Sequence, residues 1–388
     1  MSKTFTVPLC VIALFLSSLS ARAQTPLEPA EIRKISTLFD APSSNSLKCY
    51  IEQWKPSLDF AFRFDAGYLV RCRFGIFQGA KSDITLYSRI TPQGKAPQFV
   101  EDDFHLPVIT PEMTGGVDPR KVKLEFSMSG AFGVGEGDYL VEVLAIDTLK
   151  RSCRRHWKLH IVRTRSERKV PLAIAPFTVS SLDRNSWIAP PPRGHGLRLT
   201  IFLDAAPMNP RAAALRAWDR AFLMESLYSL LRQMPCESVR VVAFNLEQQR
   251  ELFRQDKFDA KGFIELSNKL REMETGTISV QALTKRNSPE FLAKLANHEL
   301  GEEDPSDALV LLGPKTHTTA GSATSMLAAK KDGHPQVFYF EYVPWLDANF
   351  RDAVQQLTRD LDGKIYNVHS PAEFGQAIQK ALAQLNKE

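Results

Sequence analysis

The sequence has no stretch of twenty uninterrupted apolar residues, which is the length that a membrane-spanning helix requires. The longest candidate, Val7 to Leu19, is too short and is broken by Pro8. A strong charge of one sign is also lacking, because a net charge of +5 over 388 residues does not indicate a dedicated polyanion binder. With 44% hydrophobic and 24% charged residues, the composition is typical of a globular protein with two or three domains.

The sequence also lacks the common catalytic motifs. A zinc hydrolase would carry His-Glu-x-x-His, but NHELGEED has Glu302 where the second histidine belongs after His298. A serine hydrolase needs Gly-x-Ser-x-Gly, and AGSATSM around Ser322 lacks the spacing and the second glycine. The glycines of GAFGVGEGDY lead into a strand, so we interpret them as a turn and not as a phosphate-binding loop. We therefore expect no catalytic residue, although a triad built from distant positions would leave no such motif.

The first residues have the features of a cleavable signal peptide. Lys3 precedes the short apolar segment, and the small-residue site Ala21-Arg22-Ala23 follows it. We expect cleavage after Ala23, a secreted or periplasmic protein, and an N-terminal extension over 24–46. Removing residues 1–23 removes Lys3, Arg22 and no acidic residue, so the net charge falls from +5 to +3.

Residues 47–164 are rich in short β-like runs. Apolar and polar residues alternate with period two in several of them, as in Val141 and Val143 around Glu142. Gly, Pro and Asp residues separate the runs. We predict an antiparallel β-sandwich of immunoglobulin-like type, with strands in LKCYIEQW, DFAFRFDAGYLVRCRFGIF, SDITLYSRI, PQFVEDDFHL, VKLEFSMSG, DYLVEVLAI and RHWKLHIV.

The second half has a different pattern. Residues 165–196 are rich in proline and serine and are interpreted as a linker along a domain surface. Over 197–388, continuous apolar runs, as expected for strands covered on both faces, occur in LRLTIFLD, SVRVVAFN, DALVLLG, QVFYFEYV and KIYNV. Periodicity and capping residues predict helices over 209–234, 259–273, 289–300, 346–361 and 371–386. We therefore predict a doubly wound α/β domain of Rossmann type with a mainly parallel sheet.

The densest run of charge extends from Lys150 to Lys169 and contains Glu167 as its one acidic residue. It could form a polyanion-binding edge with Trp157 as a stacking platform. The alternative is a strand whose charged side faces water and discourages edge-to-edge aggregation. Because period-two alternation divides these charges between two faces, we favour the second interpretation and expect no nucleic-acid partner.

Four cysteines remain after cleavage, namely Cys49, Cys72, Cys153 and Cys236. In an oxidising compartment they can form disulfides. Four cysteines allow three complete pairings, and their spacing does not choose among them.

The second half resembles a von Willebrand factor A domain over 195–387. The resemblance is carried by LTIFLD followed by a long helix, by VRVVAFN and QQRELFRQD as an edge hairpin, and by the ending GKIYNVHSPAEFGQAIQKAL. The whole layout is similar to secreted bacterial proteins with a von Willebrand A-related domain, many of them acidobacterial. That resemblance implies an extracytoplasmic setting and supplies no biochemical activity.

The resemblance also implies a metal site, which this sequence does not complete. Cation-binding A domains carry Asp-x-Ser-x-Ser after the first strand, and the serine hydroxyls complete the oxygen shell of Mg²⁺. Asp204 matches the aspartate, but Ala206 and Met208 replace the serines. VLLGPKT has no aspartate where the family places one, and METGTIS offers a threonine ligand as Thr275 or Thr277. We expect a degenerate site with no metal or cofactor, and we interpret Asp204 as a cap or dipole partner of helix 209–234.

In the similar bacterial proteins, cysteines occupy the positions of Cys49 and Cys153. These two residues lie in the first and last predicted strands of the sandwich. The resemblance therefore implies a Cys49–Cys153 disulfide, with Cys72 and Cys236 either free or joined across the domains.

Three functions are compatible with these patterns. The first is a non-catalytic protein-interaction, adhesion or assembly role with a protein partner at the C-terminal edge of the α/β sheet, where open sheets present their loops. Candidate interaction residues at this edge are Asp204, Asn209, Thr277, Lys315 and Thr316. The alternatives are an extracytoplasmic hydrolase with a site between the two domains and a structural envelope component.

Overall fold

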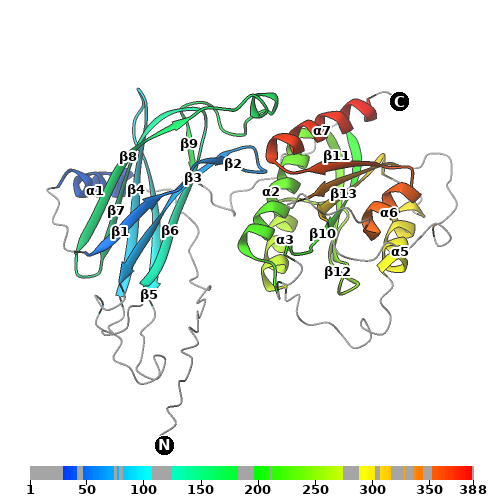
Figure 1. Ribbon diagram of the computed structural model, residues 1–388, viewed down its shortest axis with the longest axis horizontal. Coiled ribbons are helices and arrows are strands. Elements are labelled where there is room, and N and C mark those ends of the chain that lie inside the picture. Colours follow the sequence, from blue (N-terminus) through cyan, green and yellow to red (C-terminus); the bar gives the residue numbers. More distant parts are fainter. Residues whose placement is uncertain are drawn as a thin grey trace, which may run out of the picture. The chain divides into compact units, whose positions relative to one another are not determined.

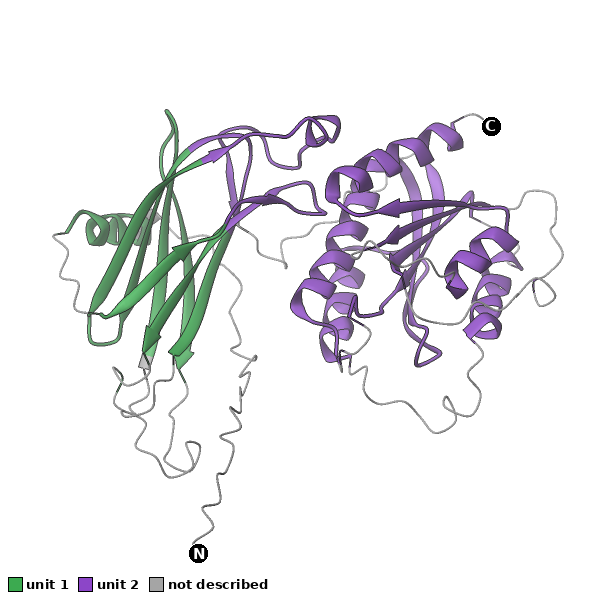
Figure 2. Ribbon diagram, in the orientation of Figure 1, with its two compact units in different colours: residues 1–54, 67–131, 139–159 green, residues 55–66, 132–138, 160–388 purple. Residues whose placement is uncertain are grey.

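The computed structural model divides the chain into two compact units (Figure 2). The first comprises 1–54, 67–131 and 139–159, and the second comprises 55–66, 132–138 and 160–388. The described residues are 29–41, 47–73, 77, 82–106, 125–181, 196–209, 212, 214–273, 288–301, 306–315, 327, 335–343 and 352–386.

Two antiparallel sheets form the β-rich part of the chain (Figure 1). One has the order β1 (Cys49–Gln53), β3 (Phe64–Arg73), β6 (Glu125–Val134), β9 (Val179–Ser181), with β2 (Ser57–Leu58) also paired to β3. The other has the order β5 (Gln98–Leu106), β4 (Ser82–Pro92), β7 (Gly137–Asp147), β8 (Ser152–Ile161). The expected alternation is present, since Val141 and Val143 are buried and Glu142 between them is not.

The two sheets face each other through a buried polar contact and aromatic packing. The hydroxyl groups of Tyr68 on β3 and Ser88 on β4 lie 2.8 Å apart. The Tyr68 ring also meets the ring of Trp157 on β8, with 6.2 Å between the ring centroids. A fully buried tyrosine needs such a hydroxyl partner, so this pair helps to fix how the sheets pack.

The N-terminal extension contains a helix that the sequence patterns did not predict. Helix α1 (Pro29–Asp40) packs Ile35 and Phe39 against Leu144. The guanidinium of Arg89 lies 4.8 Å above the Phe39 ring and also pairs with Asp40 at 2.8 Å. The helix is held mainly by these contacts, because twelve residues form a marginal helix on their own.

The second unit contains a six-stranded mixed sheet. Its order is β12 (Arg250–Gln255), β11 (Cys236–Asn245), β10 (Leu197–Asp204), β13 (Ala308–Pro314), β14 (Gln336–Tyr342), β15 (Lys364–Val368). All neighbouring strands are parallel except β11 and β12, which form the expected edge hairpin. Numbered within this sheet, the order is 3-2-1-4-5-6, the arrangement of doubly wound sheets.

Helices cover both faces of this sheet. One core contains buried residues of α2 (Ala217–Gln233), α3 (Ala260–Glu272) and α7 (Pro371–Leu385), and the other contains those of α5 (Ser288–Leu300) and α6 (Ala353–Asp360). Along β10, Ile201 and Leu203 face the first core, whereas Phe202 between them faces the second. Because both faces are apolar, this strand shows a continuous apolar run in the sequence and no period-two pattern.

The first helix of this sheet begins later than predicted, at Ala217 and not at residue 209. The carboxylate of Asp219 accepts a hydrogen bond from the N–H of Arg216 at 2.8 Å and another from the N–H of Met208 at 3.1 Å. Asp219 thus stabilises the helix start and the loop before it. The predicted role of Asp204 as the cap of this helix is wrong, because Arg216 is the N-cap residue and Asp219, the third residue of the helix, completes a capping box with it.

The predicted boundary between the domains also differs from the observed units. The segment 55–66, expected in the sandwich, belongs to the second unit. The predicted linker 165–196 contains a short 3₁₀ helix, η3 (Glu167–Lys169), and strand β9. This organisation depends on hydrogen bonds between residues that are far apart in the sequence. Local sequence patterns therefore do not predict it.

The segment 55–66 contains a tight turn. Asp59 accepts hydrogen bonds from the N–H of Arg63 at 2.7 Å and from its Nε at 2.9 Å. Phe62 adopts a left-handed backbone with φ of 59°, which is uncommon for a bulky residue. The turn therefore holds Phe60 and Phe62 in positions that packing, and not backbone preference, determines.

The two phenylalanines of this turn lie in the core of the second unit. The Phe60 ring is 4.8 Å from that of Phe222 on α2 and 5.4 Å from that of Tyr342 on β14. The Phe62 ring lies 6.1 Å from that of Phe374 on α7. The backbone carbonyl of Phe60 also has a hydrogen-bond donor, because Ser229 Oγ donates to it at 2.5 Å.

Candidate functional site

The C-terminal edge of the mixed sheet carries two buried carboxyl groups. Asp204 ends β10 and Glu341 lies near the end of β14. Between them in the sheet, Gly313 of β13 is paired with Glu341, and a Cβ added to Gly313 would lie 2.7 Å from the Asp204 Cβ. A glycine at this position leaves space beside the Asp204 side chain that any other residue would fill.

The carboxyl group of Asp204 is buried without a hydrogen bond of ordinary geometry. Asp204 is 2% exposed, and neither of its carboxyl oxygens accepts a hydrogen bond of ordinary geometry from any residue that the structure describes, although the N–H of Leu246 lies close enough to affect its pKa. Burial, followed by the nearby carboxylates of Asp352 and Glu247, raises its pKa well above the usual value. The backbone N–H of Leu246 lowers the pKa to a smaller extent. Burial therefore favours the protonated form of Asp204 over the charged form.

Glu341 is buried but has hydrogen-bond donors. Gln355 Nε2 of α6 donates to both of its oxygens, at 2.7 and 2.8 Å. Burial and then Asp352 raise the pKa of Glu341 to about 7, although Gln355, Lys315 and Arg359 oppose this shift. Glu341 therefore changes its protonation near neutral pH.

Asp352 and Tyr339 complete this group, which we call the acidic pocket and define as Asp204, Tyr339, Glu341, Asp352 and Gln355. Asp352 accepts a hydrogen bond from the N–H of Gln355 at 2.7 Å and so caps α6. Tyr339 is fully buried, and its hydroxyl has no hydrogen-bond partner among the described residues. Burial and the carboxylates of Asp352, Glu341 and Asp204 raise the pKa of Tyr339. The pocket can hold protons, and it concentrates acidic groups where water has little access.

The donor set beside Asp204 does not fit a hydrated Mg²⁺ ion. Mg²⁺ requires near-octahedral oxygen coordination. Ala206 and Met208, which follow Asp204 in the chain, are 4% and 5% exposed and offer no side-chain oxygen. Among the described residues, no three His, Cys, Asp or Glu side chains gather in a way that could hold a metal ion.

The structure brings some of the predicted interaction residues to this edge. Lys315 is half-buried, its N–H donates to the Tyr342 carbonyl at 2.9 Å, and its ammonium group lowers the pKa of Glu341. Asn209 is also half-buried, and its carbonyl accepts from the N–H of Ala212 at 2.9 Å. Thr277 and Thr316 lie outside the described residues.

Sequence reasoning missed the partners of Asp204 in the acidic pocket. Glu341 stands in the otherwise apolar run QVFYFEYV, and a charged residue within a doubly covered strand was the available signal. Asp352 and Gln355 fall within the range 346–361 that was predicted as one helix, and the observed helix α6 begins at Ala353. Their meeting with Asp204 depends on how α6 packs beside β14, which spacing does not reveal.

The near match to a zinc motif is part of a buried ion-pair network. Glu299 on α5 is 5% exposed and accepts from Arg240 Nη1 and Arg254 Nη1, each at 2.6 Å. Thr200 Oγ1 also donates to it at 3.3 Å. His298, in contrast, has a side chain that is 57% exposed. Glu299 is therefore a structural residue that anchors α5 to β11 and β12.

Several cations of the basic run are used within the fold. Arg151 pairs with Asp147 at 2.6 Å, and Arg163 pairs with Glu136 at 2.8 Å. Arg154 donates from Nη1 to the Phe39 carbonyl at 2.9 Å. These contacts favour the interpretation of the run as a partly solvated strand. The glycine-rich GAFGVGEGDY covers the end of β6, the connection at Gly135 and Glu136, and the start of β7, so it leads into a strand as expected.

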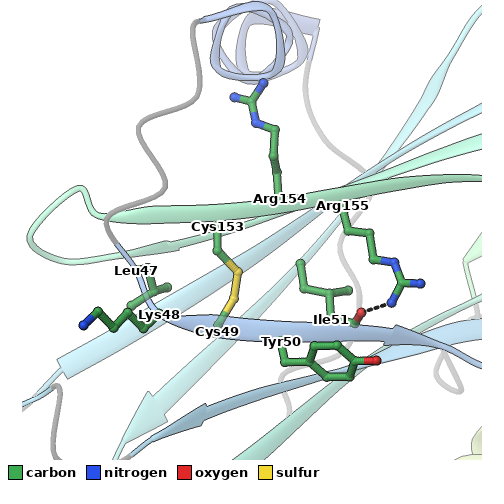
Figure 3. A pocket seen from close by; sticks show the side chains of 8 residues that line it. All are labelled: Leu47, Lys48, Cys49, Tyr50, Ile51, Cys153, Arg154 and Arg155. Atoms are coloured by element: carbon green, nitrogen blue, oxygen red, sulfur yellow. Dashed lines mark hydrogen bonds between the residues drawn. A yellow bond between two sulfur atoms is a disulfide. The ribbon is translucent and has the colours of Figure 1, made fainter.

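The expected disulfide is present, since Cys49 and Cys153 are joined with a Cα separation of 6.2 Å. Figure 3 shows this bond beside a hollow of about 450 Å³, which is lined by Leu47, Lys48, Cys49, Tyr50, Ile51, Cys153, Arg154 and Arg155. Among the described cysteines, Cys72 and Cys236 are free and buried, and burial raises the pKa of each thiol to about 12. The alternative of a second disulfide between them is wrong.

No protein-family model matches the chain, and no curated protein is significantly similar to it. Among solved structures, a protein described as ApaA from Bordetella pertussis is 12% identical with a TM-score of 0.17, over 31% of this chain and 94% of that one. The β-glucuronidase of Bacteroides uniformis is 12% identical with a TM-score of 0.19, over 81% of this chain and 38% of that one. The β-glucuronidase of Parabacteroides merdae is 11% identical with a TM-score of 0.19, over 84% of this chain and 48% of that one. At these TM-scores, none of the three identifies the fold or activity of this chain.

The acidic pocket predicts that stability falls as the pH rises. The unfolded chain releases the Glu341 proton near pH 4.5, whereas the folded protein keeps it to about pH 7. Between these values the folded state binds more protons, so its free energy of unfolding decreases with pH. The pKa change corresponds to a loss on the order of 3 kcal/mol.

Replacing Glu341 by glutamine is expected to remove most of this loss. Urea unfolding at pH 5 and pH 8 measures the change in the free energy of unfolding with pH. The substitution Glu237→Gln, at an exposed position of β11, is the control. An equal pH dependence in wild type and Glu341→Gln would show that the pocket does not hold the proton.

Proposed function

We propose that this protein is a non-catalytic, extracytoplasmic protein-binding module with a von Willebrand A-like domain that lacks a working metal site. The C-terminal edge of the mixed sheet, around Asn209 and Lys315, is its binding surface. The observation that carries the proposal is the acidic pocket: at the position of the family's metal, the carboxyl group of Asp204 is buried beside the apolar residues Ala206 and Met208, which offer no side-chain oxygen. A partner therefore contacts the surrounding loops directly and needs no bridging cation.

The architecture supports the family part of the proposal. A 3-2-1-4-5-6 sheet with an antiparallel edge strand and helices on both faces agrees with a von Willebrand A-like domain. The two facing antiparallel sheets agree with an immunoglobulin-like sandwich. Both folds are common carriers of binding surfaces on their loops.

The disulfide supports the extracytoplasmic setting. Disulfides persist in oxidising compartments, and Cys49 is bonded to Cys153. Within the described part of the chain, no helix is long and apolar enough to cross a membrane. The signal peptide predicted over 1–23 agrees with export, and its cleavage can be checked by N-terminal sequencing of the mature protein.

The test is affinity capture with immobilised mature protein, using envelope and culture-medium proteins of the organism that produces it. The capture is run in Mg²⁺ and in EDTA, with the wild type and with Asn209→Ala and Lys315→Ala. Lys294→Ala, at an exposed position of α5, serves as the control. We expect one partner to be retained equally with and without Mg²⁺ and to be reduced several-fold by the two edge variants only. Retention that requires Mg²⁺, or that neither edge variant changes, would overturn the proposal.

A further inference from the structure

Three cysteines meet in the first unit. Cys49 on β1 is directly opposite Cys72 on β3, and the next inward pair, Ile51 and Val70, is buried in the same register. Directly opposed residues of antiparallel strands point to the same face. Cys72 therefore lies on the face from which Cys49 reaches Cys153 on β8.

Cys49 has two partners at bonding distance in the folded sheet. Directly opposed residues in antiparallel pairs have Cα atoms about 4.5 to 5.5 Å apart. A disulfide spans Cα separations of about 4.4 to 6.8 Å, so the register places Cys49 and Cys72 at a separation that a disulfide can span. The observed Cys49–Cys153 bond, with its Cα separation of 6.2 Å, is one of two pairings that the fold accepts.

The hollow beside the disulfide gives an outside thiol access to Cys49. Cys49 is half-buried, whereas Cys153 is 5% exposed. The side chains of Lys48, Arg154 and Arg155 line the same hollow, with Arg155 donating to the Ile51 carbonyl (Figure 3). Cationic side chains stabilise a thiolate, which is the reactive form of a thiol. These three side chains therefore favour the approach of a thiolate to the hollow.

We propose that Cys49, Cys72 and Cys153 form an exchangeable disulfide site that a thiol–disulfide oxidoreductase engages through this hollow. The partner's thiolate attacks Cys49 Sγ, a bond forms between the two sulfurs, and the bond to Cys153 breaks. Cys153 leaves as a thiolate and takes a proton from water. Cys72 then gives its proton to water and attacks Cys49 Sγ, which releases the partner's thiolate. The products are a Cys49–Cys72 disulfide, a Cys153 thiol and the unchanged partner, so no oxidant or reductant is consumed.

The surroundings of Cys72 keep this exchange slow in the isolated protein. Burial and then the carboxylate of Asp147 raise the pKa of Cys72 to about 12. Little thiolate is present at neutral pH, and the thiolate is the nucleophile. The native Cys49–Cys153 bond therefore persists until a partner opens it.

The first test is peptide mapping of the Cys153→Ser full-length protein by mass spectrometry without reduction. We expect a Cys49–Cys72 disulfide in most molecules. Cys49 and Cys72 that both react with an alkylating reagent in the folded variant would overturn the proposal.

A second test uses the native sequence and does not depend on the folding of that variant. The wild type and Cys72→Ser are incubated with a mixture of reduced and oxidised glutathione at pH 8 and then alkylated. We expect alkylated Cys153 together with the Cys49–Cys72 bond in the wild type, and several-fold more Cys49–glutathione in Cys72→Ser. Cys236, buried in the second unit, is the internal control. An unchanged Cys49–Cys153 bond in both proteins, or equal amounts of Cys49–glutathione, would contradict the proposal.

Discussion

Replacing Glu299 by alanine is expected to destabilise the protein by about 3 kcal/mol, near the lower end of the range for breaking a buried ion pair. The substitution removes the acceptor of Arg240 and Arg254, whose side chains are only 17% and 23% exposed. Arg240 keeps its contact with Asp256 and Arg254 keeps Glu251, so the loss is not larger. Urea unfolding measures the change in the free energy of unfolding.

The control for this substitution is Lys294→Ala on the same helix, because Lys294 is exposed. We expect it to change the free energy of unfolding by less than about 0.5 kcal/mol. If Glu299→Ala were as stable as this control, Glu299 would not be the anchor of α5, and the zinc-motif interpretation would have to be reconsidered.

Replacing Phe60 by alanine is expected to destabilise the protein by about 3 to 5 kcal/mol, the cost of truncating a buried aromatic side chain. The Phe60 ring contacts those of Phe222, Tyr342 and Phe374 with centroid distances of 4.8 to 5.8 Å. The contacts with Phe222 and Tyr342 are edge-to-face, and such contacts add to the energy of burial. The effect should appear in the unfolding of the mixed-sheet unit, since Phe60 belongs to it.

The matched control is Phe177→Ala, because Phe177 is 36% exposed. The melting temperatures of both variants are measured by thermal unfolding. We expect a much larger decrease for Phe60→Ala than for Phe177→Ala. Equal decreases would mean that the turn 59–62 does not contribute to the core of the second unit.

The strands and helices of the second unit were predictable where each carries its own local signal. The continuous apolar run LRLTIFLD is strand β10, and Ser370 with Pro371 marks the start of α7, where Ser370 accepts from the N–H of Glu373. The start of α2 was not predictable in the same way. The start of the helix depends on Asp219, which lies inside the helix, and on Met208, which lies before it. Apolar residues at helical spacing continue through this region, so the spacing does not mark where the helix begins.

The candidate site was predictable only at Asp204. A lone aspartate at the end of an apolar strand is visible in the sequence, and so are the apolar residues Ala206 and Met208 after it. The role of Asp204 was not visible, because it depends on burial and on Asp352, which is more than a hundred residues away along the chain. Likewise, the position of Phe60 in the second unit follows from tertiary packing, which overrides the local strand pattern around it.

Calorimetric titration of the mature protein with Mn²⁺ at pH 7.5, alongside Asp204→Asn, tests most directly whether the acidic pocket replaces a metal site. Mn²⁺ serves as the probe because it accepts the same oxygen ligands as Mg²⁺. We expect no saturable binding by either protein, since the described side chains around Asp204 supply too few oxygens in the right arrangement to coordinate an ion. Saturable binding by the wild type that Asp204→Asn abolishes would establish a metal site and contradict cation-independent partner binding.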